Sequence, residues 1–137
     1  MSQNTAPIFT QTPDIQFARM IATANTDMTM ATGVSHSLFI AGPSGSYVNK
    51  IRFKPSGSVT ATVVRVFINN GGITTTATNN SLYGEISLPT ITVSNTLAQN
   101  DFEIPMNIAL PANYRLFGTT ATALGGGLDI TTIAGDY

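Results

Sequence analysis

The stretch VTATVVRVFINNGG, residues 59–72, decides the fold class of this chain. Its β-branched residues and its phenylalanine favour a pleated strand over residues 59–69. Alternate side chains of a strand point to opposite faces, and both faces here are apolar. The strand should therefore be central, with its second face covered by a loop or by a neighbouring subunit. The faces are Val64, Val66 and Ile68 on one side and Val63, Arg65 and Phe67 on the other.

The same period-two alternation recurs on both sides of this stretch, broken by clusters of glycine, proline and asparagine. No segment carries a capped 3.6-residue period of the kind that predicts a helix. The pattern predicts an all-β chain of eight to nine short strands, arranged as an antiparallel, jelly-roll-like β-sandwich. The expected strands are residues 15–21, 37–41, 47–54, 59–69, 81–88, 90–94, 101–110, 114–118 and 128–134.

The N-terminal residues differ from the rest of the chain. Residues 1–14 contain two prolines and little alternation, so they are expected to form an extended arm. Residues 15–137 are then expected to form a single β-sandwich domain. No signal peptide is expected, because the N-terminus lacks a basic region followed by an apolar run.

Charged residues make up only 9% of the chain, against about 25% in an average soluble domain. The formal net charge of −1 argues against a nucleic-acid binder, and the short apolar runs argue against a membrane span. A free monomer usually carries more charge to stay soluble, so we infer that other subunits cover much of the surface. An ordinary β domain with a neutral surface is the alternative.

Few residues could carry catalysis or hold a metal. The chain has no cysteine and one histidine, which excludes thiol chemistry, disulfides and sites built from several histidines. His36 cannot pair with the serines beside it, because neighbouring residues on a strand face opposite ways, so a turn or surface histidine is expected. Asp101 and Glu103 share one strand face, where paired carboxylates can bind calcium or hydrolyse glycosides. A solvated outer face is favoured for them, and neither an enzyme nor a cofactor or metal site is expected.

The six basic residues are unevenly distributed, and half of them lie on one predicted strand, residues 47–54. We expect its basic face to contact an acidic partner surface. A charged edge strand that blocks aggregation is the alternative, and nucleic-acid contact is a weaker one. The basic face is Val48, Lys50, Arg52 and Lys54, and the opposite face is Asn49, Ile51 and Phe53.

Arg65 interrupts an apolar strand face and needs a partner if it is buried. Glu85 and Glu103 are both possible partners, and a subunit interface would also satisfy it. The sequence does not choose between these.

Several blocks of this chain together resemble small virion structural proteins of tailed bacteriophages. The resemblance spans most of the chain beyond residue 14 and implies a capsid decoration, or cement, protein. Such proteins are often jelly rolls that sit as trimers on the head, and no functional residues carry over from the group. The blocks are FARMIATANTD from Phe17, YVNKIRFKPSG from Tyr47, VTATVVRVFINNGG from Val59, TNNSLYGEIS from Thr78, IALPANYRL from Ile108 and the closing ITTIAGDY.

The resemblance leads to the expectation of a homotrimer on the outer surface of the capsid, bound to the major capsid protein and bridging its subunits. The arm, with Pro7, Ile8 and Phe9, is expected to form a strap on the shell or on a neighbouring subunit. The alternative is a tail, fibre or vertex component that binds a host glycan or receptor. Tyr83, Tyr114 and the loops 73–80 and 119–127 would form that glycan site.

Overall fold

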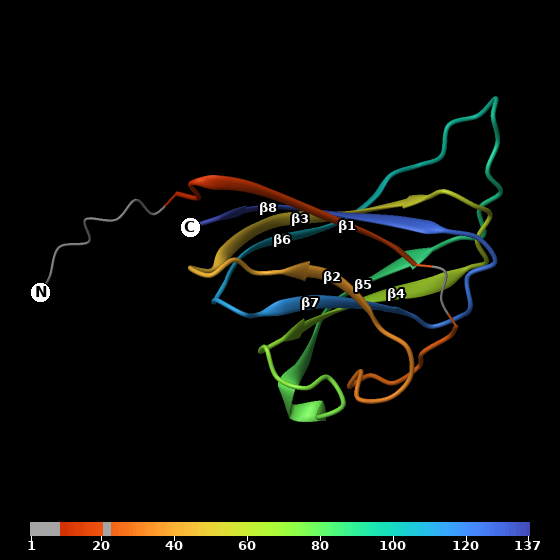
Figure 1. Cartoon of the computed structure of the whole chain (residues 1–137). Coiled ribbons are helices and arrows are strands. Elements are labelled where there is room, and N and C mark those ends of the chain that lie inside the picture. Colours follow the sequence, from red (N-terminus) through yellow and green to blue (C-terminus); the bar gives the residue numbers. More distant parts are fainter. Residues whose placement is uncertain (1–8, 21–22) are drawn as a thin grey trace, which may run out of the picture.

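The computed structural model describes residues 9–20 and 23–137, and these residues form two four-stranded antiparallel sheets packed face to face (Figure 1). The all-β sandwich prediction is confirmed. Within the described residues the only helical turn is a 3-10 turn, η1 (Ala77–Asn79), and no helix is long and apolar enough to cross a membrane. The strands are β1 (Thr12–Met20), β2 (His36–Ile40), β3 (Ser46–Pro55), β4 (Thr62–Asn69), β5 (Asn80–Leu88), β6 (Phe102–Leu110), β7 (Arg115–Thr120) and β8 (Leu128–Asp136).

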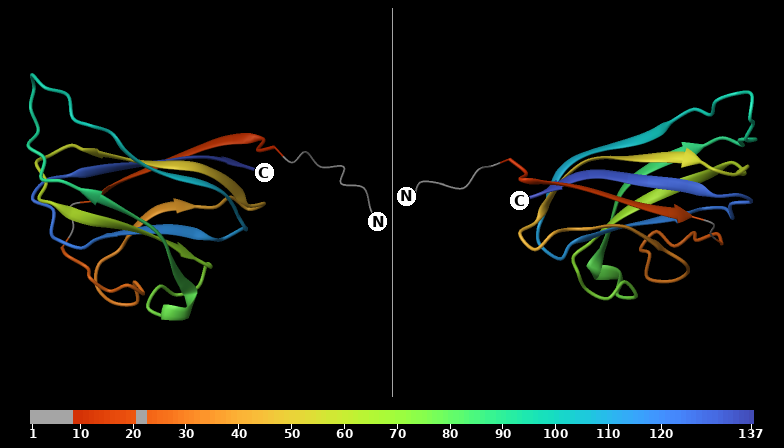
Figure 2. Two further views of the ribbon diagram at one scale, coloured as in Figure 1. Left: turned by 180° about the vertical axis from the view of Figure 1, so that it is seen from behind. Right: turned by 45° about the horizontal axis from the view of Figure 1, so that its top comes forward.

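The strand order is that of a jelly roll. The first sheet has the order β1-β8-β3-β6 and the second sheet has the order β2-β7-β4-β5. The antiparallel pairs are nested, because β1 pairs with β8, β2 with β7, β3 with β6, and β4 with β5. The chain is thus one long hairpin rolled into two layers, which the two views of Figure 2 show. Pro105 lies in β6, which ends the first sheet, and an edge strand is where a sheet tolerates proline.

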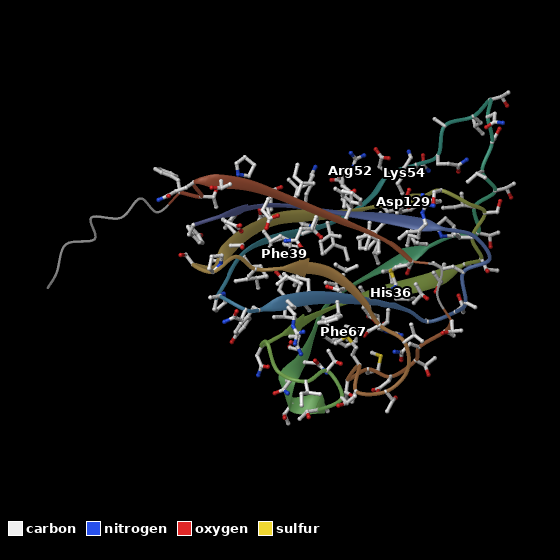
Figure 3. All side chains as sticks on the ribbon, in the orientation of Figure 1. His36, Phe39, Arg52, Lys54, Phe67 and Asp129 are labelled. Carbon is white, nitrogen blue, oxygen red and sulfur yellow. The ribbon has the colours of Figure 1, made fainter. Side chains whose placement is uncertain are left out.

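The main core fills the space between the sheets, where Figure 3 places Phe39. A second, smaller cluster lies on the outer side of the second sheet, around the fully buried Phe67 of β4. Met30, from the loop of residues 23–35, packs there against Phe67 and Phe117. The prediction for β4 is therefore confirmed: it is an inner strand, and a loop of the same chain covers part of its second face.

The loop of residues 23–35 is held in shape by its own polar side chains. The carboxylate of Asp27 accepts hydrogen bonds of 2.7–2.9 Å from the N–H and hydroxyl groups of both Thr29 and Thr32. The amide of Asn25 donates to two carbonyls of the loop, each at 2.9 Å. The bonds from Thr29 and then those from Thr32 hold the pKa of Asp27 well below its ordinary value. Because its pKa is depressed, the Asp27 carboxyl stays ionised at pH 4, near the ordinary pKa of an aspartate, and at pH values well below it. It therefore keeps these bonds, and the loop should tolerate mild acid.

One predicted strand face is wrong. The register of β3 against β8 shifts between Val48 and Lys50, which makes Asn49 the extra residue of a β-bulge. Against β6 the register shifts at the same place, but there the extra residue is on β6, where Met106 and Asn107 stand opposite Asn49. The bulge reverses the alternation, so Val48 is fully buried with Ile51 and Phe53 rather than lying beside Lys50. Asn49 is exposed instead of sharing the core face.

Some boundaries also differ from the prediction. Strand β1 begins at Thr12, so the last residues of the expected arm, 12–14, belong to the first sheet. Pro7 and Ile8 lie outside the described residues. In place of a strand over residues 90–94 there is a single bridge between Ile91 and Val59.

Candidate functional site

The outer sides of the two sheets differ in how far the chain covers them. The loop of residues 23–35 packs on the second sheet, whereas the outer side of the first sheet, here called the open face, carries four surface hollows formed by described residues. On its β1 edge, Phe17 is 83% exposed and Ile15 is 60% exposed. Large exposed apolar side chains beside such hollows are typical of contact surfaces.

The open face also holds most of the chain's ion pairs. Nζ of Lys50 lies 3.1 Å from Oε1 of Glu103, and Nζ of Lys54 lies 2.8 Å from Oδ1 of Asp101. Arg52, between the two lysines, pairs with both carboxylates. These five residues, three from β3, Glu103 from β6 and Asp101 just before β6, are called the charge ladder. Hydrogen bonding by Lys54, aided by Arg52, lowers the pKa of Asp101. Water screens exposed pairs of this kind, so the ladder orders the surface more than it stabilises the fold.

The charge ladder changes the interpretation of the basic residues on β3. The charged-edge alternative is wrong, because β3 lies between β8 and β6. Asp101 and Glu103 lie on the outer side, as expected, but they face the chain's own cations. Contact of Lys50, Arg52 and Lys54 with an acidic partner stays a prediction. Figure 3 shows Arg52, Lys54 and Asp129 together on the outer side of the first sheet.

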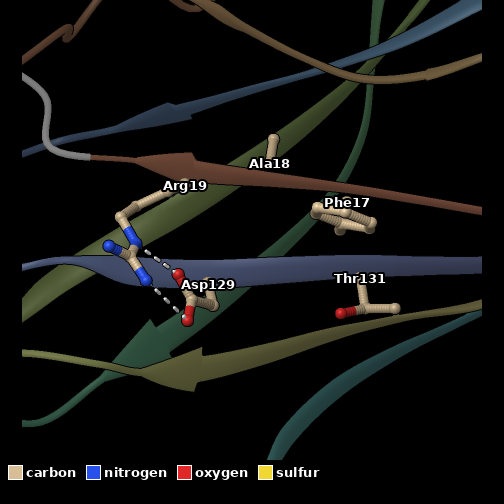
Figure 4. A pocket seen from close by; sticks show the side chains of 5 residues that line it. All are labelled: Phe17, Ala18, Arg19, Asp129 and Thr131. Atoms are coloured by element: carbon tan, nitrogen blue, oxygen red, sulfur yellow. Dashed lines mark hydrogen bonds and ion pairs between the residues drawn. The ribbon is translucent and has the colours of Figure 1, made fainter.

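A second ion pair flanks the exposed phenylalanine. Arg19 of β1 donates to Asp129 of β8 through Nε at 2.7 Å and through Nη2 at 3.3 Å (Figure 4). This bidentate bond lowers the pKa of Asp129 and raises that of Arg19. Phe17 and Thr131 line the same hollow. An exposed aromatic side chain with a polar rim therefore lies at this edge.

Uncharged residues occupy the other end of the open face, where Figure 1 shows the described N-terminal residues beside β8. Gly135 of β8 lies against Thr10 here, since an added Cβ would lie 2.6 Å from the hydroxyl oxygen of Thr10. Only glycine allows β8 and Thr10 to approach so closely. Two hollows at this end share Thr10 and Tyr47, and we call them together the tyrosine groove. Its lining residues are Phe9, Thr10, Gln11, Pro13, Tyr47, Asn49, Ile133, Ala134, Gly135 and Tyr137.

Arg65 pairs with Glu85, one of the two partners considered from the sequence. Its Nε donates to Glu85 of the neighbouring strand β5 at 2.8 Å, and its side chain is 13% exposed. Glu103 belongs to the other sheet and is bound in the charge ladder. Among the described residues, Nη1 of Arg65 is buried without a partner. Contact of Arg65 with another subunit stays a prediction.

His36 is half-buried at the start of β2, which differs from the turn or surface position expected. Within the described part of the chain its Nε2 is buried without a hydrogen-bond partner. Burial lowers the pKa of His36, because the charged ring is removed from water.

This depressed pKa predicts a pH-dependent stability. The folded protein must bury a charge once His36 is protonated, so the free energy of unfolding should fall as pH drops from 7 to 5, below the ordinary histidine pKa near 6.5. His36 is the sole histidine, and His36→Leu should remove most of this fall. Urea unfolding of both proteins at pH 7 and pH 5 measures it. An equal fall in the variant would contradict the assignment.

The glycan site expected from loops 73–80 and 119–127 is not assembled. Asn69 of β4 lies opposite Arg115 of β7, and Val64 lies opposite Thr120, so the two loops leave the second sheet at opposite ends. Tyr83 donates its hydroxyl to the carbonyl of Met106 at 3.0 Å. Among residues 9–20 and 23–137, no group of three or more His, Asp or Glu side chains is placed to hold a metal ion.

Sequence reasoning missed Phe17, Ile15 and the tyrosine groove. The sequence of β1 does not show which of its two sides faces the core, since apolar residues occur at both odd and even positions. The groove depends on Gly135 and Tyr47, which are far apart in the chain and adjacent only through the pairing of β3 with β8.

No protein-family model matches this chain, and no curated protein matches it. Solved structures of infectious bursal disease virus show a distant likeness. A Gt strain chain is 12% identical with a TM-score of 0.36, covering 98% of this chain and 36% of its own. A Gx strain chain is 14% identical with a TM-score of 0.38, covering 97% and 37%. A chain from the crystal structure of the T13 viral particle is 12% identical with a TM-score of 0.31, covering 98% and 39%. This chain thus spans less than two-fifths of the chains it matches, and these values are too low to support an inference about function.

Proposed function

We propose that this chain is a non-enzymatic structural protein of a virion, which decorates the outer surface of a bacteriophage capsid and stabilises it by bridging capsid subunits. The open face carries the proposal, because it presents Phe17 and Ile15 while the chain's own loop covers part of the second sheet. The sequence blocks that resemble virion proteins of tailed bacteriophages support a phage capsid as the partner.

The chemistry of the open face suits protein contact. Aromatic anchors surrounded by a polar rim are typical of protein interfaces, and Phe17 with the Arg19–Asp129 pair has this arrangement. A stable interface buries about 1,600 Å² in total. Bridging contacts of that size add buried area across joints between capsid subunits, where internal DNA pressure would part the shell. A homotrimer, with residues 1–11, the part of the expected arm that precedes β1, as a strap, is part of the proposal.

The copy number of the chain in purified particles of its source virus tests this function. Quantitative mass spectrometry should find hundreds of copies per particle if the chain decorates the head. A few to a few tens of copies would instead indicate a tail, fibre or vertex component. Absence from the particle would overturn the virion role.

Phe17→Asp is expected to weaken particle binding. A charge in place of a central aromatic anchor should cost about 2 kcal/mol or more, which is roughly 30-fold in affinity. Purified variant is added to particles that lack the chain, and occupancy is measured against concentration.

Ile73→Asp is the matched control, since Ile73 is 71% exposed but follows β4, which belongs to the second sheet. It should bind like the unaltered chain. Because Phe17 and Ile73 are both exposed, both variants should keep the thermal stability of the parent. Equal occupancy of the Phe17→Asp variant and the parent would argue against the open face as the contact surface.

A further inference from the structure

We propose that the tyrosine groove binds a neutral carbohydrate. This inference goes beyond the proposed function, since a chain that stabilises a capsid has no need of a sugar site. It also moves carbohydrate recognition away from Tyr83 and Tyr114 to a different pair of tyrosines, Tyr47 and Tyr137.

Three aromatic side chains from separate segments meet at one end of the groove. Phe9 precedes β1, Tyr47 belongs to β3 and Tyr137 follows β8. Aromatic rings offer a flat apolar surface, and tyrosine adds a polar tip at its edge. A sugar ring has the matching character, with an apolar C–H face and hydroxyl groups around its rim. The hydroxyl of Tyr47 already lies 3.3 Å from Oδ1 of Asn107, which orients its ring.

The groove is preformed by backbone hydrogen bonds. The N–H of Gln11 donates to the carbonyl of Asp136 at 2.7 Å, which fixes the β1 wall against β8. The N–H of Tyr137 donates to the carbonyl of Gly45 at 3.2 Å, which fixes the aromatic end. Gly135 leaves room for the side chain of Thr10, which packs against it and fixes the position of this lining residue. A preformed site binds at a lower entropic cost than one that must be ordered by its ligand.

The polar side chains that line the groove are neutral hydroxyls and amides. Thr10, Gln11 and Asn49 line it, and Asn49 makes no side-chain hydrogen bond to the described residues. Amides and hydroxyls both donate and accept hydrogen bonds, as sugar hydroxyls do. A few such groups on an otherwise apolar lining are typical of small-molecule sites.

Charge and pairing argue against other occupants. None of the described lining residues is Lys, Arg, Asp or Glu, so a phosphate, sulfate or uronic acid would find no cation there. The cations of the open face are engaged in the charge ladder and in the Arg19–Asp129 pair. A peptide strand could not extend the sheet in the groove, because β8 forms the floor and is paired on both sides, with β1 and β3.

Affinity electrophoresis of the full chain tests this site. Native gels containing dextran, mannan or galactan are compared with gels containing polygalacturonate, an acidic polysaccharide. We expect at least one neutral polysaccharide to retard the chain, and polygalacturonate not to do so. Tyr47→Ala and Tyr137→Ala should each raise the apparent dissociation constant about tenfold or more. Tyr47→Phe keeps the ring and should retain most of the binding.

Phe17→Ala is the matched control, since it removes an exposed aromatic side chain from the same face outside the groove. Circular dichroism verifies that each variant is folded. No retardation by any of the three neutral polysaccharides would overturn the proposal, as would an equal loss in Phe17→Ala. Reduced particle occupancy of Tyr137→Ala without any sugar binding would make the groove a protein contact. These outcomes leave the copy number unchanged, so they are distinct from a failure of the proposed capsid role.

Discussion

Val48→Asp is expected to leave little or no folded protein. The bulge at Asn49 puts Val48 on the core side of β3 with Ile51 and Phe53, and all three are fully buried. An unpaired charge in that position costs several kcal/mol. Without the bulge, Val48 would lie on the outer side with Lys50, where an aspartate is tolerated.

The substitution should remove most of the roughly 5–15 kcal/mol that stabilises a domain of this size. Far-UV circular dichroism and urea unfolding measure the effect. Asn49→Asp is the matched control, because it introduces the same charge at the neighbouring exposed position, and its effect should stay within about 1 kcal/mol. A Val48→Asp variant that unfolds cooperatively near the urea midpoint of the parent would contradict the role assigned to the bulge.

Phe67→Ala is expected to lower the free energy of unfolding by about 3–5 kcal/mol. Phe67 is fully buried although it points away from the main core, because Met30, Phe117 and Leu82 surround it. The substitution removes the surface on which the loop of residues 23–35 packs. The loop should therefore exchange its amide hydrogens faster as well.

Urea unfolding and hydrogen exchange measure these two effects on the same variant. Phe17→Ala serves again as the control, since an exposed phenylalanine should change stability by no more than about 0.5 kcal/mol. A loss in the free energy of unfolding below about 1 kcal/mol for Phe67→Ala would mean that the packing of the loop on Phe67 does not stabilise this side of the second sheet.

Alternation predicted the sandwich because most strands here have one clearly apolar side. The bulge at Asn49 escaped prediction, since an exposed asparagine inside a strand has no distinctive local pattern. The sequence also did not show which side of β1 faces the second sheet. In the structure Gln16 determines it, because its amide donates to the carbonyl of Ile40 at 2.9 Å and accepts from the N–H of Ile40 at 3.0 Å. This bond turns Gln16 inward and leaves Ile15 and Phe17 outside.

The ion pairs could not be predicted for a different reason. Lys54 and Asp101 lie 47 positions apart in the chain, and they meet only because β3 pairs with β6. Arg65 and Glu85 face each other through the register of β4 and β5. Charge on a strand can be read from sequence, but its partner depends on sheet order, which local patterns do not contain.

The nested strand order has a consequence for the timing of synthesis. In both sheets a late strand lies inside, with β8 between β1 and β3 and β7 between β2 and β4. A ribosome adds about 5–20 residues per second, so the roughly 80 residues between the ends of β3 and β8 take about 4–16 s. Throughout that interval β1 has no partner and β3 keeps an open edge, both of which invite association with other nascent chains. Lys50, Arg52 and Lys54 lie on that waiting strand, so we expect their like charge to oppose edge-to-edge pairing of two nascent chains.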